Sequence, residues 1–172
     1  MPEKETLERA KEDLREGKSP KTAAGEFIHE EIEHVREGKH GVRSPQQAIA
    51  IGLSKARRAG IPVPPPAKGK AKESTRTSAE RDYEKGQSGD REKPSARRSR
   101  AREEVLQREP HSTASHQALS RQARKAAKSR TSKERHDAAE KAVRTKGKTG
   151  LKRAAKKAAA TRSRTRTRKR AA

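Results

Sequence analysis

The sequence lacks several residue types on which common protein classes depend. It has no cysteine and no tryptophan, and only one phenylalanine and one tyrosine among 172 residues. Without cysteine the chain has no disulfide and no thiolate-bound metal, and no run approaches the 18 apolar residues of a membrane-spanning helix. With so few large apolar side chains, a single globule of this length cannot offset its chain entropy. We therefore expect a small folded part and a large part without a core.

Positive charge is present in excess. Lysine and arginine number 46 against 23 acidic residues, which gives a formal net charge of +23. Residues 1–66 carry a net charge of only +1, whereas residues 67–172 carry +22. The first five residues lack the apolar core of a secretory signal, so we expect the chain to stay in the compartment where it is made. Its charge requires an anionic partner or a cloud of counterions.

Residues 1–61 are predicted to form a three-helix head. The sequence Arg-Glu-Gly-Lys occurs twice, each time shortly before a Ser-Pro pair that begins at Ser19 or Ser44. In this pattern glycine ends one helix in the left-handed conformation, and serine caps the next helix with proline in its first turn. Apolar residues recur at helical spacing. They place the three helices at about 3–16, 20–37 and 45–59.

Three residues of these helices attract attention. Gly52 lies on the apolar stripe of the third helix, where it permits a close approach of another helix. Ile51 lies off that stripe, which predicts a self-association surface and a homodimer formed through the head. Glu31 interrupts the stripe of the second helix. A thin bundle with wide stripes also accounts for the last two positions, because exposed apolar residues are common.

Residues 67–172 are predicted to form a largely disordered, low-complexity basic tail. The proline-rich segment 62–66 favours an extended conformation and is expected to be the linker between head and tail. Alanine-rich segments of the tail have helical patterns, but none has enough apolar surface to fold on itself. The predicted fold class is therefore all-α, with a small three-helix head and a tail of transient helices. The tail is most basic at 141–172, where 14 basic residues are accompanied by no acidic one.

The basic residues of the tail predict a nucleic-acid-binding role. Blocks of like charge attract polyanions, and contacts with the phosphates of duplex DNA release counterions with little dependence on base sequence. RNA offers the same phosphates, so it remains an alternative partner. The residues expected to make these contacts are Arg121, Arg124, Lys125, Lys128, Lys141, Arg144, Lys146, Lys148, Lys152, Arg153, Lys156, Lys157, Arg162, Arg164, Arg166, Arg168, Lys169 and Arg170.

No group of residues predicts catalysis, a cofactor site or a metal site. His29 and His34 enclose three glutamates, but zinc proteases place their two histidines four positions apart, and these are five apart. His40 adds no third ligand at a recognisable spacing. The tail also lacks the apolar face that inserts into a membrane surface. We therefore expect no enzyme activity, no small-molecule substrate, no cofactor, no metal and no membrane binding.

A helix-turn-helix made of the second and third expected helices is another arrangement for binding DNA. Recognition helices contact bases mainly from their N-terminal part, where only Gln46 and Gln47 are suitable. The cations of this helix, Lys55, Arg57 and Arg58, instead cluster at its C-terminal end, where they complement the helix dipole.

Two stretches of the head form a distinctive pattern: residues 25–41 (GEFIHEEIEHVREGKHG) and 46–60 (QQAIAIGLSKARRAG). In these stretches the head resembles a family of small, basic bacterial proteins that are often labelled DNA-binding. In composition, the tail is similar to the C-terminal tails of linker histones and of bacterial histone-like proteins. The resemblance implies a bacterial cytoplasmic setting and a role in the nucleoid, and it supplies no catalytic residue.

The sequence as a whole thus predicts a non-enzymatic, histone-like protein that binds DNA with little sequence preference. An RNA-associated or ribosome-associated protein is one alternative, and an adaptor whose head binds another protein is a second. A hydrophilic stress-protective protein is a third, although such a protein has no need to segregate its charge.

Overall fold

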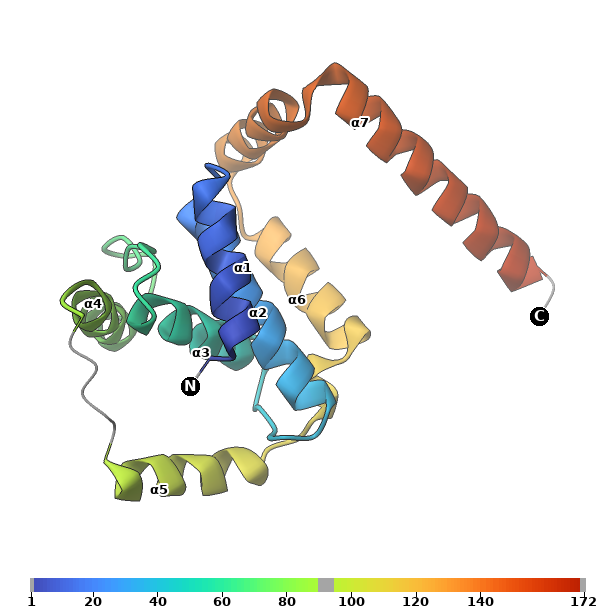
Figure 1. Ribbon diagram of the computed structural model, residues 1–172. Coiled ribbons are helices and arrows are strands. Elements are labelled where there is room, and N and C mark those ends of the chain that lie inside the picture. The colour runs from blue at the N-terminus through green and yellow to red at the C-terminus, as the bar shows by residue number, and fades with distance from the viewer. Residues whose placement is uncertain (1, 90–94, 171–172) are drawn as a thin grey trace. The chain divides into compact units, whose positions relative to one another are not determined.

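The computed structural model describes residues 2–89 and 95–170, and the side chains of residues 165–170 lie outside the described part. Over the described ranges the backbone forms α-helices and one short 3-10 helix, with no β-strand (Figure 1). The chain divides into two compact units, residues 1–122 and 123–172. Among the described helices, none has the length and apolar character needed to cross a membrane.

Three helices form the centre of the first unit. They are α1 (Lys4–Arg15), α2 (Pro20–Arg36) and α3 (Pro45–Arg58), and each begins and ends within one residue of the range expected from the sequence. α1 and α3 both pack against α2 (Figure 1). α2 is therefore the element that connects α1 and α3.

Local signals in the sequence determine where these helices begin and end. The Oγ of Ser19 accepts a hydrogen bond from the N–H of Thr22, and that of Ser44 accepts one from Gln47, both at 3.3 Å. These bonds confirm the predicted caps. The three helices are followed by glycines with positive φ of 75°, 79° and 87°, and the next residues bond back to the last helical turn. The glycines are Gly17, Gly38 and Gly60.

Two small apolar clusters hold the helices together. The larger surrounds Phe27, which is fully buried, and consists mostly of alanine. The smaller surrounds Val35 near the end of α2 and includes Ala114 from a distant part of the chain. Gly52 lies so close to α2 that a Cβ at this position would be 2.7 Å from the Cα of Ile28, which confirms the predicted close approach. Small residues therefore bring the helix backbones together where large apolar side chains are scarce.

Ile51 has apolar neighbours within the molecule. It is half-buried and packs, together with Ile32, against the smaller cluster. Ala114, which belongs to that cluster, comes from the region expected to be disordered. The position of Ile51 off the α3 stripe is therefore explained without a second copy of the chain. Self-association through Ile51 stays a prediction.

The predicted fold is wrong for residues 67–172, because this region is not a largely disordered tail. Alanine, lysine, arginine and glutamate are strong helix formers, and this propensity outweighs the scarcity of apolar surface from which disorder was expected. The helices found here are α4 (Glu73–Gln87), α5 (Ala96–Gln107), the 3-10 helix η1 (Ser112–Ala114), α6 (His116–Lys128) and α7 (Ser132–Arg170).

α4 packs against α3, and its buried residues are Ala79 and Asp82. The buried carboxylate of Asp82 accepts hydrogen bonds from Ser54 and from the Nε of Arg58, the latter at 2.6 Å. At Gly86 a Cβ would overlap the carbonyl oxygen of Arg57. Hydrogen bonds to Asp82 and the close backbone approach at Gly86 thus hold α4 against α3 in place of apolar contacts.

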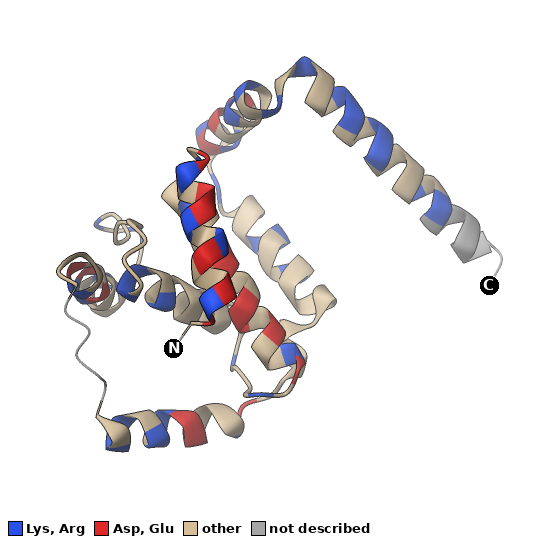
Figure 2. Ribbon diagram, in the orientation of Figure 1, with Lys and Arg blue, Asp and Glu red and all other residues tan. Residues whose placement is uncertain are grey.

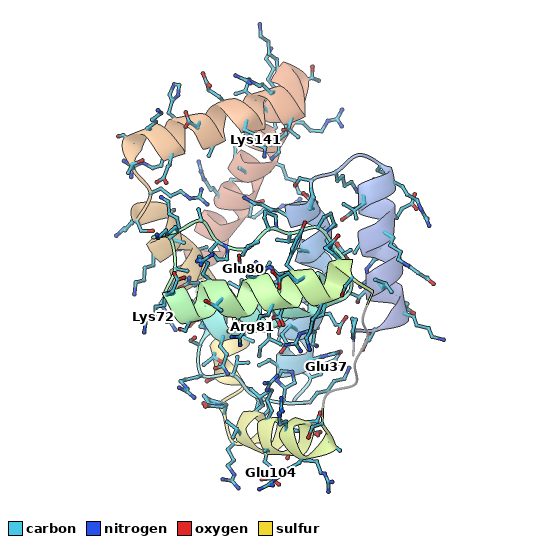
Figure 3. The ribbon with its side chains drawn as sticks, turned by 90° about the vertical axis from the view of Figure 1, so that its left-hand side faces the viewer. Glu37, Lys72, Glu80, Arg81, Glu104 and Lys141 are labelled. Atoms are coloured by element: carbon cyan, nitrogen blue, oxygen red, sulfur yellow. The ribbon has the colours of Figure 1, made fainter. Side chains whose placement is uncertain are left out.

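The outer side of α4 is polar. Figure 3 looks onto this helix, which carries the half-buried Glu80 and the exposed Arg81. Arg76 pairs with Glu73 at 2.7 Å and with Glu80 at 3.2 Å along the same helix. Pairs at this spacing support helices by a few tenths of a kcal/mol each. The two sides of α4 therefore differ: the side facing α3 has small residues and a buried polar side chain, and the outer side has exposed charged side chains.

The proline-rich segment 62–66, expected to be a linker, is packed on the head. Val63 is buried in the larger apolar cluster, and its carbonyl oxygen accepts a hydrogen bond from the Nε of Arg57 at 3.1 Å. Arg57 also approaches the carbonyl oxygen of Pro64 at 3.4 Å. The composition changes at this segment, but the compact unit continues past it to residue 122.

The segment around η1 is held against α2 and the loop that follows it. Thr113 donates its hydroxyl proton to the carbonyl oxygen of Val42 at 2.6 Å, and the Nδ1 of His111 lies 3.2 Å from the carbonyl oxygen of Val35. Arg36 donates from Nε to the carbonyl oxygen of Ala114 at 3.1 Å. Hydrogen bonds from side chain to backbone therefore fix a stretch that has low sequence complexity.

Replacing Gly86 by alanine should loosen α4 from α3. The new methyl group would overlap the carbonyl oxygen of Arg57, and such overpacking costs about 1–3 kcal/mol. We expect faster hydrogen exchange of the α4 amides, measured by NMR, while the amides of α1 and α2 keep their protection. Gly25→Ala is the matched control, because Gly25 lies within α2 and a Cβ there would have no neighbouring atom within 4 Å. Unchanged exchange in Gly86→Ala would show that α4 is not docked there.

Candidate nucleic-acid interface

Four of the residues predicted to bind nucleic acid share one face of α6. Arg121, Arg124, Lys125 and Lys128 follow one another at helical spacing, so at 100° per residue they fall within an arc of about 100°. All four are exposed, and α6 has no acidic residue. The first turn of the helix is capped by Ser115, whose Oγ accepts the N–H of Ala118 at 3.3 Å. The cap and the spacing together present four cations to solvent in one row.

α7 consists of two helical segments separated at Gly147. The backbone there has φ 63° and ψ 172°, which is not helical. At the start of α7, Thr131 and Glu134 form a capping box: the N–H of Glu134 donates to Thr131 Oγ1 at 3.2 Å, and the N–H of Thr131 donates to Glu134 Oε2 at 2.9 Å. Capping and intrinsic propensity account for this helix, since its described side chains are exposed or half-buried.

The charge of the second unit is strongly one-sided. Residues 123–172 contain 20 basic and three acidic residues, and every acidic residue precedes Gly147. Figure 2 shows the contrast between the mixed charges of α1 and the repeated basic bands along the second segment of α7. Lys148, Lys152 and Lys156 are four positions apart and form a row along one side. Like charges at this spacing destabilise a helix by a few tenths of a kcal/mol per pair, so a bound polyanion would stabilise the segment.

The predicted binding residues all lie on α6 and α7. Lys141 projects from the first segment of α7 (Figure 3). The guanidinium nitrogen Nη2 of Arg144 lies 3.8 Å from Oε2 of Glu140, one helical turn earlier. Among the predicted binding residues whose side chains are described, Arg144 alone makes an ion pair with another described residue. Four predicted residues belong to α7, but their side chains lie outside the described ones: Arg166, Arg168, Lys169 and Arg170.

The three cations at the end of α3 are engaged inside the first unit. Arg57 is buried; burial lowers the pKa of its guanidinium, and the nearby charge of Asp82 opposes that shift. Arg58 pairs with Asp82 at 2.6 Å, and the Nζ of Lys55 lies 2.7 Å from Glu31. These contacts give each of the three cations a structural role that does not require a helix-turn-helix.

A group of titratable side chains that was not expected from the sequence lies near the end of α2. Glu31 is 1% exposed, and one potential ligand atom from each of Glu31, His34 and His40 lies within 4.8 Å of the others. His40 reaches the group because the chain reverses after α2 at Gly38. A signal was available in the sequence: Glu31 and His34 are three positions apart and therefore share a helix face. The spacing between histidines alone misses this set, because one of its three members is a glutamate.

Residues 4–68 match the model of a family of unknown function (DUF6496). The matched stretch contains α1, α2, α3 and the proline-rich segment, and it ends before α4 begins. No curated protein and no solved structure matches the chain. The description of the family names no activity, so the bacterial setting and the DNA-binding role implied by the resemblance stay predictions.

Proposed function

We propose that this protein is a non-enzymatic DNA-binding protein that associates with the nucleoid through the cations of α6 and α7. The observation that carries the proposal is the charge of residues 123–172, with 20 basic and three acidic residues. Among the described side chains of that unit, the basic ones are exposed, and Arg144 is the one predicted binding residue engaged in an ion pair. So large an excess of positive charge on helices without a core favours a function in binding a polyanion.

Counterion release would drive the binding. Duplex DNA carries about one charge per 1.7 Å of its axis, and each phosphate neutralised by lysine or arginine releases condensed ions. About 10 such contacts would give a slope near −9 in a plot of log K against log salt concentration. Base edges are not needed for this interaction, and the chain has few of the aromatic residues that stack on single-stranded bases. Duplex DNA is therefore the favoured partner, with little sequence preference.

Removing the four cations of the α6 face should flatten the salt dependence of binding. In the full chain, Arg121, Arg124, Lys125 and Lys128 are replaced together by glutamine, which preserves helix propensity. If each contacts one phosphate, the slope for a duplex of about 30 base pairs becomes shallower by about 3.6. Fluorescence anisotropy across a series of salt concentrations measures the slope, and circular dichroism checks that helix content is kept.

The matched control removes the same charge from residues 4–68. Lys4, Lys11, Lys21 and Lys68 are exposed and make no ion pair with any described residue, so replacing all four by glutamine should leave the slope nearly unchanged. Equal effects of the two variants would contradict the assignment of the interface to α6, because net charge alone would then explain binding. A duplex RNA of the same length, measured in parallel, tests the RNA alternative. Absence of binding to both nucleic acids at low salt would favour a stress-protective role.

A further inference from the structure

Buried carboxylates outnumber their cationic partners near the end of α2. Glu30 and Glu31 are 4% and 1% exposed, and they share one ammonium group: Lys55 Nζ lies 3.4 Å from Glu30 Oε1 and 2.7 Å from Glu31 Oε2. Despite this ion pair, neither oxygen of Glu31 accepts a hydrogen bond of good geometry. A buried carboxylate in this condition is costly. The site thus favours a further positive charge.

His40 directs a ring nitrogen at the other oxygen of Glu31. Its Nδ1 lies 3.1 Å from the carbonyl oxygen of Gly41, and because a carbonyl can only accept, Nδ1 carries the hydrogen. Its Nε2 lies 3.3 Å from Glu31 Oε1. In a neutral ring this Nε2 has a lone pair, which would face a negatively charged oxygen. A cation between the two atoms removes the repulsion, either as a proton on Nε2 or as a metal ion.

His34 completes the group and is held in position by Glu3. Its Nε2 lies 3.1 Å from Glu3 Oε1. This contact between the ring and the Glu3 side chain fixes the orientation of the ring. Histidines that bind metals commonly have such a carboxylate or carbonyl partner on the ring. Both histidines of this group have one: Glu3 for His34, and Gly41 for His40.

We propose that Glu31, His34 and His40 bind a zinc ion. Two imidazoles and one carboxylate form a ligand set that zinc favours, and their ligand atoms already lie within 4.8 Å of one another. Zinc would supply the positive charge that the buried glutamates lack, while Lys55 retains the second oxygen of Glu31. Because two ligands come from α2 and the third from the loop that follows, the ion would fasten the connection between α2 and α3. The proposal does not depend on DNA binding.

Zinc titration of the full chain, free of any affinity tag, tests the proposal. Calorimetry at about pH 7.5 should show one ion bound per chain with a dissociation constant below about 10 μM, well under the millimolar range of weak surface binding. His34→Gln and His40→Gln should each weaken binding at least tenfold. Glu3→Gln, which changes only the partner of His34, should weaken it about 10-fold or more while leaving one site per chain.

Two matched controls separate this site from other histidines. His29 is exposed on the same helix and is not part of the group, so His29→Gln should bind zinc as the unchanged protein does. A second group with ligand-like spacing, which contains His136, Asp137 and Glu140, is exposed on α7. His136→Gln should therefore also retain the tight site. Loss of binding in His136→Gln, with normal binding in His34→Gln and His40→Gln, would overturn the proposal.

NMR of the histidine rings provides a test that needs no variant. Zinc should shift the ring nitrogen signals of His34 and His40 and leave those of His29 and His136 unchanged at one equivalent. If the Nε2 of His40 is instead protonated at neutral pH and zinc does not bind, the missing charge is a proton and the proposal is wrong. Shifts confined to other histidines, or no saturable binding below about 100 μM zinc, would also overturn it.

Discussion

Phe27→Ala should destabilise the first unit by about 3–5 kcal/mol, the usual cost of truncating a fully buried phenylalanine. Phe27 is the only phenylalanine in the chain, and the cluster around it consists mostly of alanine. Leu7, Leu14 and Leu53 also pack against this cluster, but a protein interior relaxes only partially when a large side chain is removed, so a cavity would remain. Urea denaturation monitored through the fluorescence of Tyr83 measures the change, since no tryptophan interferes. Tyr83 lies on α4 and therefore reports on the packed first unit.

The control for this variant is Val105→Ala on α5. Val105 is 52% exposed, so its truncation should change the free energy of unfolding by less than about 0.5 kcal/mol. Similar values for the two variants would mean that Phe27 is not the centre of the core. A change for Phe27→Ala alone in the m value, which is the dependence of the unfolding free energy on urea concentration, would indicate either an altered compactness of the denatured or native state or the loss of one-step unfolding.

Lys55→Met should be about as damaging, for an electrostatic reason. Lys55 is the shared partner of the buried carboxylates of Glu30 and Glu31. Removing one side of a buried ion pair typically costs about 3–5 kcal/mol, because an uncompensated charge remains. The measurement is again urea denaturation followed by Tyr83 fluorescence. A chelator is present in every sample, so that metal binding does not enter the comparison.

The double variant Glu31→Met with Lys55→Met separates charge from packing. Replacing both members of a buried pair by apolar residues is often tolerated, so the double variant should be more stable than Lys55→Met alone. Part of the deficit should persist because Glu30 also loses its partner. If the double variant is the less stable one, the carboxylate of Glu31 stabilises the site through contacts other than Lys55, such as that with His40.

The helices of the head were predictable because their signals are local. Ser19 and Ser44 act on amides three residues away, and the glycines that end the helices act through their own φ angle. α4 was not predicted to be packed, because its contacts depend on distant partners. The sequence does not indicate that Asp82 will meet Arg58, or that Gly86 will meet the backbone at Arg57. Contacts made by small and polar residues produce no periodic pattern of apolar residues in the sequence, so the packing of α4 could not be predicted from it.

The candidate sites were predictable to different degrees for the same reason. The shared face of Arg121 to Lys128 follows from helical spacing alone. The engagement of Lys55 with Glu31 requires two helices to cross at a particular place, and the approach of His40 requires a chain reversal after α2. The sequence shows Glu31 as a polar residue in an apolar stripe, but its contacts with Lys55 and His40 follow only from how the chain packs.

The backbone at Gly147 has a geometric consequence for a long helical element. Its angles lie in a region that is essentially restricted to glycine, so the two parts of α7 form a bent pair of rods. A straight helix of 39 residues would be about 58 Å long. The surface of a duplex curves away from a straight helix that crosses it, so such a helix would contact the duplex over only part of its length. If α7 binds a duplex as proposed, the bend at Gly147 would let each helical segment contact its own stretch of the duplex, and the segment after Gly147, which has no acidic residue, would bind it more strongly.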